Sequence, residues 1–165
     1  MSAALDQTPD TGEQGVVPAP TILERMGFRV GEFALLLPAQ SAHEVVLAPP
    51  ASRLPNTAPW LLGLANLRGS LVPLVSTATA FGTTREGNSS AYALILGQGD
   101  GVVALVIDGL PRLLNIDPAE RIVGNARVPA MLERSVVGAY THGGRTWLDI
   151  DVVQLLDTLS RTIVT

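Results

Sequence analysis

The sequence contains no lysine and no cysteine, and it is poor in charged and aromatic residues. All eleven of its basic residues are arginines. Without lysine the chain has neither a Walker A phosphate loop nor a group that forms a Schiff base with a substrate. Without cysteine it has no thiol nucleophile, no disulfide framework, and no cysteine-ligated zinc or iron–sulfur site. These absences exclude several large classes of enzyme and metalloprotein, and we expect no cofactor.

Charge is equally scarce. Charged residues make up 16% of the chain, against about 25% in a typical globular domain. The net charge of −4 argues against a nucleic-acid partner, which requires a basic face. Mean hydropathy is +0.32, yet the longest stretch without a charged residue is 16 residues, 69–84, and it is interrupted by Pro73. A membrane-spanning helix needs about 20 apolar residues. We therefore expect a cytoplasmic protein that does not insert into the membrane.

The 165 residues suffice for one domain, or for two small subdomains that share a core. Residues 1–20 are small and polar, carry three prolines and show no apolar periodicity. They are predicted to form a disordered tail, with acidic residues where a signal peptide would be basic. The folded domain is expected to span residues 21–165.

Short apolar runs separated by glycines predict a mainly antiparallel β fold. Three pairs of runs are joined by short glycine-bearing segments, as in β-hairpins: Arg68-Gly69-Ser70, residues 97–101 and Gly143-Gly144. The expected strands are residues 28–30, 32–37, 42–47, 60–67, 71–75, 92–96, 102–107, 136–141 and 145–150.

Two helices are expected, over residues 76–81 and 151–161. Ser76 and Asp151 are their candidate N-cap residues. A single helical turn is expected at residues 117–120, where Asp117 precedes a proline. Residues 21–24 form either a helical turn or a simple lead-in, and residues 111–134 are the least regular stretch.

An internal repeat underlies this pattern. Residues 34–37 align with residues 104–107, and residues 61–75 align with residues 136–150. In each copy, strands are followed after a gap by a hairpin that begins with two apolar residues and a glycine. The repeat predicts two related small β-barrels in tandem.

Catalytic patterns are weak throughout. Ser89 loosely matches a nucleophile elbow, but no strand leads into it and no helix follows. His43 and His142 have no metal-ligand spacing and are expected to be exposed. Asp149 and Asp151 would share one face of a strand, but Asp151 is better explained as an N-cap and Asp149 as an exposed strand residue. A hydrolase that uses Ser89 or this carboxylate pair is a minority hypothesis, and we expect no enzymatic activity.

The hairpin around Arg68 carries the most specific signal. Residues 62–73, with the sequence LGLANLRGSLVP, strongly resemble the signature of the CheW family. The likeness extends from about Gly27 to Leu159 and includes the Ile107-Asp108-Gly109-Leu110 segment. Residues 27–31 and 145–148 look most like the PilI branch of the family, which serves twitching motility by type IV pili.

The resemblance implies a mainly β fold of two intertwined five-stranded SH3-like barrels with short helices, including one at the C-terminus, and a division near residues 80–90. It also implies a non-enzymatic adaptor that couples methyl-accepting chemoreceptors to a CheA-type histidine kinase in chemotaxis or twitching motility. Such an adaptor is recruited to membrane-associated receptor arrays.

By the same resemblance, six residues match partner-contacting positions of the family: Arg68, Asn66, Leu67, Gly69, Glu44 and Ala42. An arginine at a rigid turn is suited to a carboxylate or carbonyl of a partner. The alternative hypothesis is a β-barrel protein that binds a small ligand between its subdomains.

Overall fold

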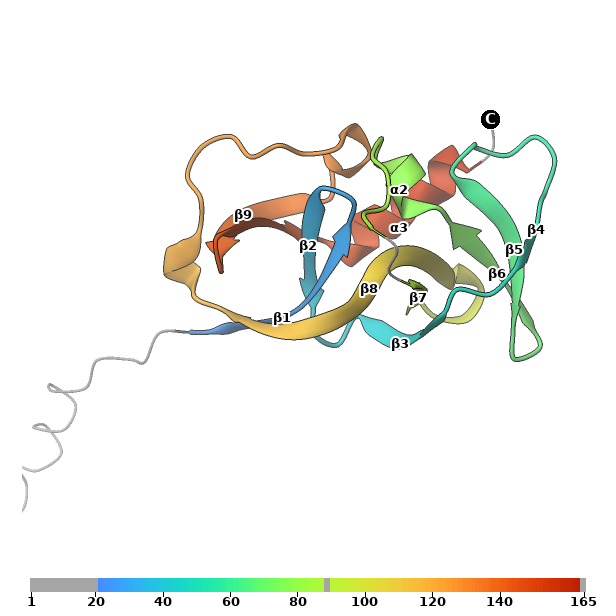
Figure 1. Ribbon diagram of the computed structural model, residues 1–165, viewed down its shortest axis with the longest axis horizontal. Helices are drawn as coiled ribbons and strands as arrows, with labels where there is room; N and C mark the ends of the chain where they lie inside the picture. Colours follow the sequence, from blue (N-terminus) through green and yellow to red (C-terminus); the bar gives the residue numbers. More distant parts are fainter. Residues whose placement is uncertain (1–20, 88–89, 164–165) are drawn as a thin grey trace, which may run out of the picture.

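The computed structural model describes residues 21–87 and 90–163, and in this part of the chain the fold is mainly β (Figure 1). The predicted tail, residues 1–20, and Ser89 lie outside the described residues. Ten strands are assigned to one continuous hydrogen-bonded sheet, which curls into two barrel-like subdomains. In the described residues, no helix is long and apolar enough to cross a membrane.

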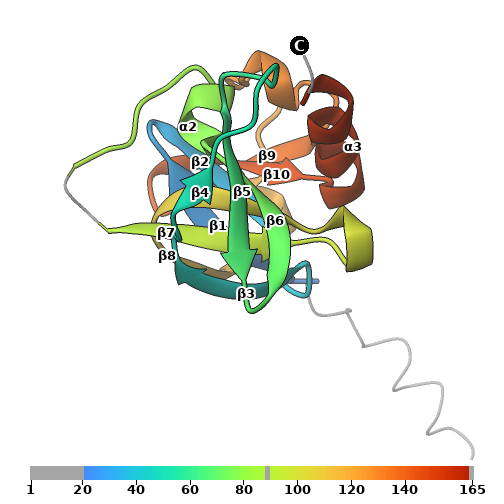
Figure 2. The same ribbon diagram turned by 90° about the vertical axis from the view of Figure 1, so that its right-hand side faces the viewer.

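The first subdomain is built from strands on both sides of the chain midpoint. Its members are β3 (Ala42–Leu47), β4 (Ala51–Ser52), β5 (Leu61–Leu67), β6 (Ser70–Val75), β7 (Ala91–Leu96) and the first half of β8 (Val103–Ile116). The chain leaves β3 and returns as the short β4, which pairs with β5. This pairing of β4 with β5 curls the strands of the first subdomain toward a barrel. Figure 2 shows the arrangement with β5 and β6 facing the viewer.

The second subdomain has five strands. It combines β1 (Leu23–Val30) and β2 (Phe33–Pro38) with the second half of β8, β9 (Val136–His142) and β10 (Arg145–Ile150). Beyond β8 the chain pairs with β9 through Arg121 and Tyr140, and this bridge draws the end of the set back to its start.

Strand β8 belongs to both subdomains and changes partner at Asp108. That residue pairs with Ala91 of β7 on one side and with Arg29 of β1 on the other. The Asp108 carboxylate also accepts hydrogen bonds from the backbone N–H of Gly31 (2.8 Å) and of Glu86 (3.2 Å). One buried side chain therefore ties the β1–β2 turn and the segment at Glu86 to the crossing point.

Each subdomain has a small core of its own, and the largest cluster lies between them. Ala65, Val72, Leu74, Ala93, Ile95, Ala104 and Val106 fill the first subdomain. Ala34, Leu36, Ile116, Tyr140 and Trp147 fill the second. The largest cluster joins strands of both subdomains to the helices α2 (Thr77–Ala80) and α3 (Val152–Thr162). The subdomains therefore share one central core.

Strand register confirms the predicted repeat in its two hairpins only. Leu61 pairs with Val75 in one hairpin, and Val136 pairs with Ile150 in the other, at the equivalent positions of the aligned segments. Both hairpins contain a register shift next to this pair. Each is followed directly by a helix, α2 or α3. The alignment of residues 34–37 with residues 104–107 is wrong by two residues, because Leu36 pairs with Asp149 where Ala104 pairs with the equivalent Leu74.

The expectation for residues 111–134 is wrong at its start, because β8 continues to Ile116. Gly109 and Pro111 resemble strand breakers in the sequence. In the structure the β1–β8 register moves from the pair Arg29–Asp108 to the pair Gly27–Arg112, so residues 109–111 form a bulge. A bulged residue needs no hydrogen bond to the neighbouring strand, which removes the objection to proline.

The helix predictions hold better at the C-terminus than at residue 76. Helix α3 is capped by Asp151, whose carboxylate accepts from the N–H of Gln154. The expected turn at residues 117–120 is η2 (Pro118–Glu120), with a complete capping box. Ser76 precedes α2 but makes no side-chain bond to the helix backbone, since its hydroxyl bonds to that of Thr79. The alternatives for residues 21–24 are decided by β1, which begins at Leu23.

Asp149 was expected to be exposed, and this is wrong. It is 5% exposed and lies in β10, where Arg25 of β1 donates from Nε to its carboxylate at 3.0 Å. The sequence of β10 indicates the face of the strand on which Asp149 lies. It does not indicate that Arg25 of another strand covers that face, which is why the prediction failed.

Replacing Asp149 by asparagine is therefore expected to destabilise the fold. Removing one partner of a fully buried ion pair costs about 3–5 kcal/mol. Arg25 keeps 22% of its side chain exposed, and we expect a loss nearer 2 kcal/mol in urea denaturation. The double variant Arg25→Met/Asp149→Leu should regain much of that loss, because it leaves no buried charge unpaired. A single variant as stable as the wild type would contradict this role.

Candidate partner-binding site

The exposed tip of the β5–β6 hairpin carries an ion pair that joins two distant parts of the chain. Arg68 donates through both terminal nitrogens to the Glu44 carboxylate of β3, from Nη1 at 2.8 Å and also from Nη2. The hydrogen bond and the negative charge of Glu44 raise the pKa of the Arg68 guanidinium above its ordinary value. The Arg68 side chain nevertheless stays 68% exposed. The ion pair thus fixes the Arg68 guanidinium in position while leaving it accessible to a partner.

The turn that presents Arg68 is strained. Arg68 and Gly69 both have positive φ, +50° and +87°, as in the type I′ turns of tight hairpins. A left-handed backbone costs a non-glycine residue about 1–2 kcal/mol. Asn66 supports the turn, since its side-chain oxygen accepts from the N–H of Gly69 at 2.8 Å. Strain of this kind, held by surrounding contacts, is typical of functional sites.

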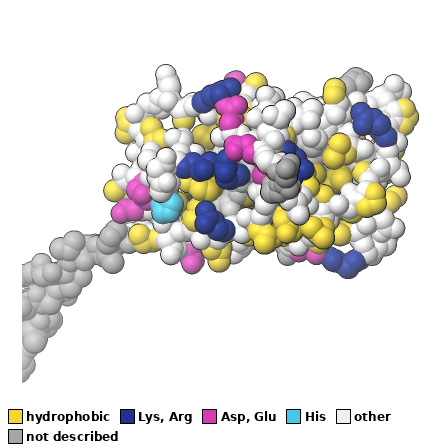
Figure 3. Space-filling view, viewed as in Figure 1, with side chains coloured by type: hydrophobic (Ala, Val, Ile, Leu, Met, Phe, Trp, Pro, Cys, Tyr) yellow, Lys and Arg dark blue, Asp and Glu magenta, His cyan; other side chains and the backbone are white. Residues whose placement is uncertain are grey.

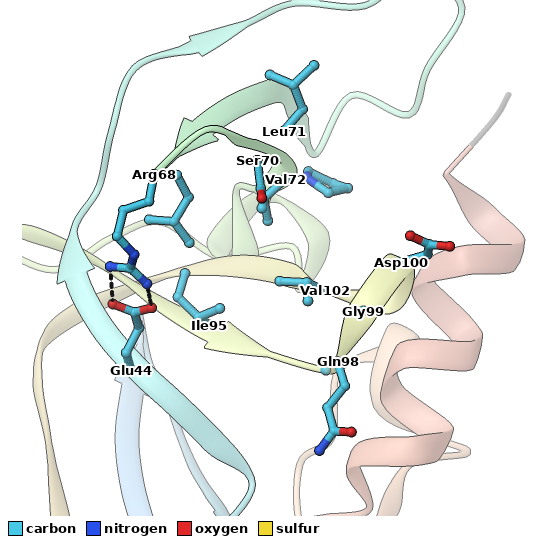
Figure 4. Close-up of a pocket in the computed structure, with 13 residues that line it drawn as sticks. Glu44, Arg68, Ser70, Leu71, Val72, Ile95, Gln98, Gly99, Asp100 and Val102 are labelled. Carbon is cyan, nitrogen blue, oxygen red and sulfur yellow. Dashed lines mark hydrogen bonds and ion pairs between the residues drawn. The ribbon is translucent and has the colours of Figure 1, made fainter.

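A groove of about 640 Å³ extends from the ion pair across the open end of the first subdomain. Figure 4 shows the Glu44–Arg68 pair at one side of the groove and Asp100 at the other. Apolar side chains line the space between them, among them Val72, Ile95 and Val102. The groove thus combines charged ends with an apolar floor.

The structure brings together three of the six predicted residues. Glu44, Leu67 and Arg68 line the groove, and a register shift next to Ala42 precedes Glu44 in β3. Asn66 and Gly69 belong to the turn that holds Arg68, so their evident role is to position it. Ala42 packs against the central cluster and does not line the groove. The assignment of these six residues to partner contacts remains a prediction.

Sequence reasoning missed the far side of the groove. The segment around η1 (Gly99–Gly101) was interpreted only as a hairpin connection, yet Gln98, Gly99 and Asp100 line the cavity. The glycines of residues 97–101 could have indicated this site, because they predict a tight exposed turn and Asp100 is the single acidic residue in it.

Of the weaker candidates, the structure describes Asp149, Asp151 and His142, and each of these has a partner within the fold. Asp149 is paired with Arg25, and Asp151 caps α3. His142 is half-buried rather than exposed, with Nδ1 3.2 Å from an oxygen of Glu120. The side chain of His43 lies outside the described part of the structure. Among the described residues, no cluster of three or more His, Asp or Glu is arranged to hold a metal ion.

Comparison with known protein families shows the family to which the chain belongs. The model of the CheW-like domain matches residues 24–160, which include every strand from β2 to β10 and all of β1 except Leu23. The chain belongs to the CheW-like domain family.

Proteins similar to this CheW-like chain are named in several bacteria. The chemotaxis protein CheW of Helicobacter pylori is 30% identical over 96 residues, 58% of each chain. A probable chemotaxis protein CheW of Rhizobium etli is 27% identical over 112 residues, 67% of this chain and 72% of its own. Protein PilI of Pseudomonas aeruginosa is 34% identical over 84 residues, half of this chain and 47% of its own. The first of these matches thus spans less than two thirds of its relative's length.

A solved structure supports the CheW-like architecture. The scaffolding protein TtCheW from Thermoanaerobacter tengcongensis superposes with a TM-score of 0.65 at 20% identity, over 79% of this chain and 90% of its own. The predicted fold class, mainly β with two SH3-like subdomains, is confirmed.

Proposed function

We propose that this CheW-like protein is a non-enzymatic adaptor that couples chemoreceptors to a CheA-type histidine kinase. Its named relatives include chemotaxis CheW proteins and PilI, so the output is chemotaxis or pilus-driven twitching. The adaptor acts in the cytoplasm, where receptor arrays at the membrane recruit it. The domain comprises residues 21–165 and follows a tail of residues 1–20.

The observation that carries this proposal is the Glu44–Arg68 pair on its strained turn. An arginine that served only the fold would gain little from an exposed position, since exposed ion pairs contribute at most about 1 kcal/mol. Here the chain accepts left-handed backbone in order to display a guanidinium beside an apolar groove. Arginines of this kind, next to apolar contacts, are enriched at the centres of protein interfaces.

Exposed leucines that do not line the groove favour a bridging role over a single contact. Hydrophobic side chains gather over β3 and β8 in the space-filling view (Figure 3). Leu47 of β3 and Leu110 and Leu113 of β8 are 65%, 64% and 69% exposed. Exposed apolar surface of this kind marks interaction sites. An adaptor that joins two different proteins needs two such faces.

The alternative of a small ligand between the subdomains has less support. The space between them holds the largest hydrophobic cluster, in which Leu37, Leu61, Leu94 and Leu105 are almost fully buried. A ligand site there would require this core to open. We therefore propose no second function.

Arg68→Glu is expected to weaken binding to at least one partner by tenfold or more, because losing one member of a charge pair that binding buries costs about 2–5 kcal/mol. The wild-type protein is immobilised and tested with a purified CheA-type kinase and a purified cytoplasmic receptor fragment from the same organism. Thermal unfolding of the variant should change little, because Arg68 is exposed.

Two further variants sharpen this experiment. Arg134→Glu makes the same charge change at an exposed residue between η3 (Ala130–Leu132) and β9, and it should bind like the wild type. The swap Glu44→Arg/Arg68→Glu rebuilds the ion pair with reversed polarity. It should remain defective if Arg68 contacts the partner, whereas full recovery would mean that the pair acts only on the fold. A wild-type protein that retains neither partner would refute the adaptor function.

A further inference from the structure

A glycine-rich ridge forms the far wall of the groove and holds Asp100 at a fixed position. Gly97 has a φ of +89°, and a side chain there would meet the carbonyl oxygen of Gly101 at 2.2 Å. The N–H of Gly101 donates to the carbonyl of Gln98 at 3.0 Å and closes the turn. The backbone around Asp100 is therefore tightly folded, and its carboxylate projects into solvent.

The Asp100 carboxylate is the uncompensated charge of the groove. Glu44 and Arg68 neutralise each other on the opposite wall. In the described part of the chain, no hydrogen bond or ion pair engages Asp100. A partner that enters the groove therefore meets one unpaired negative charge. No polar contact of the Asp100 side chain with the described residues stabilises the fold.

The ridge also separates two hollows. On its other side lies a second cavity of about 460 Å³ between β6 and α3, and Asp100 lines both. Apolar side chains dominate this second hollow, including Trp60, Leu156 and Leu159. Its other carboxylate, Asp157, is paired with Arg161 one helical turn away. Asp100 thus lies between two apolar surfaces and is the charged group available to both.

We propose that Asp100 determines which partner the groove accepts: the bound segment places an arginine or lysine against the Asp100 carboxylate and an apolar side chain on the floor formed by Val72, Ile95 and Val102. The inference rests on the adaptor function proposed above and specifies the chemistry of the partner segment at that site. A neutral segment would leave the Asp100 carboxylate unpaired, and an acidic segment would be repelled by it. The charge of Asp100 therefore contributes to affinity and also discriminates between partner segments.

The test uses the partner, kinase or receptor fragment, whose affinity falls with Arg68→Glu; if neither affinity falls, the groove is not the binding site and the role of Asp100 is overturned. Calorimetric titration of that partner against the full chain compares the wild type, Asp100→Asn and Asp100→Arg. We expect Asp100→Asn to weaken binding by about five- to tenfold and Asp100→Arg by more than about thirtyfold. Binding by Asp100→Asn should also depend less on salt concentration than wild-type binding, because a charge pair has been removed. Glu133→Arg, a charge reversal at an exposed residue beside η3, should stay within about twofold of the wild type.

The outcomes separate the two proposals. If Arg68→Glu weakens binding but both Asp100 variants bind like the wild type with the same salt dependence, the role of Asp100 is overturned and the adaptor function stands. If the wild type binds neither protein, both proposals are overturned. Asp100 lies in an exposed turn, and the conservative asparagine variant keeps the test decisive if the arginine variant fails to fold.

Discussion

Replacing Leu36 by aspartate is expected to unfold the protein. Leu36 is fully buried in the core of the second subdomain, among Ala34, Ile116, Tyr140 and Trp147. Truncating such a leucine already costs about 2–5 kcal/mol. An unpaired carboxylate in the same place adds a desolvation cost of several kcal/mol. The sum is comparable to the whole stability of a typical domain, about 5–15 kcal/mol. Circular dichroism and thermal unfolding should show loss of the cooperative transition.

A matched control lies on a neighbouring surface. Leu113 of β8 is 69% exposed, so Leu113→Asp makes the same chemical change with little burial. It should unfold within about 1 kcal/mol of the wild type. A folded Leu36→Asp protein with a normal transition would show that the face assigned to β2 is wrong.

The second large effect is expected for Gly63→Ala. Gly63 has a φ of +135°, where residues with a side chain are strained, and an added Cβ would lie 2.1 Å from the carbonyl oxygen of Ser52. Ser52 belongs to β4, which pairs with β5 at Leu64, so the obstacle is backbone that cannot move without breaking this pairing. We expect a loss of about 3 kcal/mol or more in chemical denaturation.

Gly69→Ala is the informative comparison. Gly69 also has a positive φ, +87°, but no atom lies within 4 Å of an added Cβ. Its cost should be limited to backbone strain, about 1 kcal/mol. Equal losses at the two glycines would mean that the close approach of β4 to β5 does not contribute to the requirement at Gly63.

Much of the fold was predictable from local chemistry. Glycine-bearing turns marked three hairpins, and most strand boundaries lie within one or two residues of the prediction because alternation and turn residues act locally. The extension of β8 was missed, since Gly109 and Pro111 break a regular strand but fit a bulge. Asp149 was misassigned because its cation, Arg25, comes from a strand more than a hundred residues earlier. Ion pairs between residues so far apart in the sequence leave no pattern in the sequence near either residue.

The site was predictable only in part. Arg68 at a hairpin tip is visible in the sequence, whereas its partner Glu44 became a candidate only through the resemblance to the family. The opposite wall depends on how the η1 turn meets β6 and β7, and periodicity does not report such an approach. Asp100 consequently attracted no attention, although it is the single acidic residue of its loop.

The crossing of β8 between the subdomains has a consequence for synthesis on the ribosome. Strands β1 and β2 emerge first and pair with each other, but their remaining partners are the second half of β8 and the late strand β10. The first subdomain must likewise wait for β7 and β8. Neither barrel can close while the nascent chain is short, so the apolar β2 has only β1 beside it until β10 has been synthesised. Contacts of such long range also fold slowly, and a chain that ends before β8 retains neither subdomain core in full. Because both subdomains share β8, neither can fold before that strand has been synthesised.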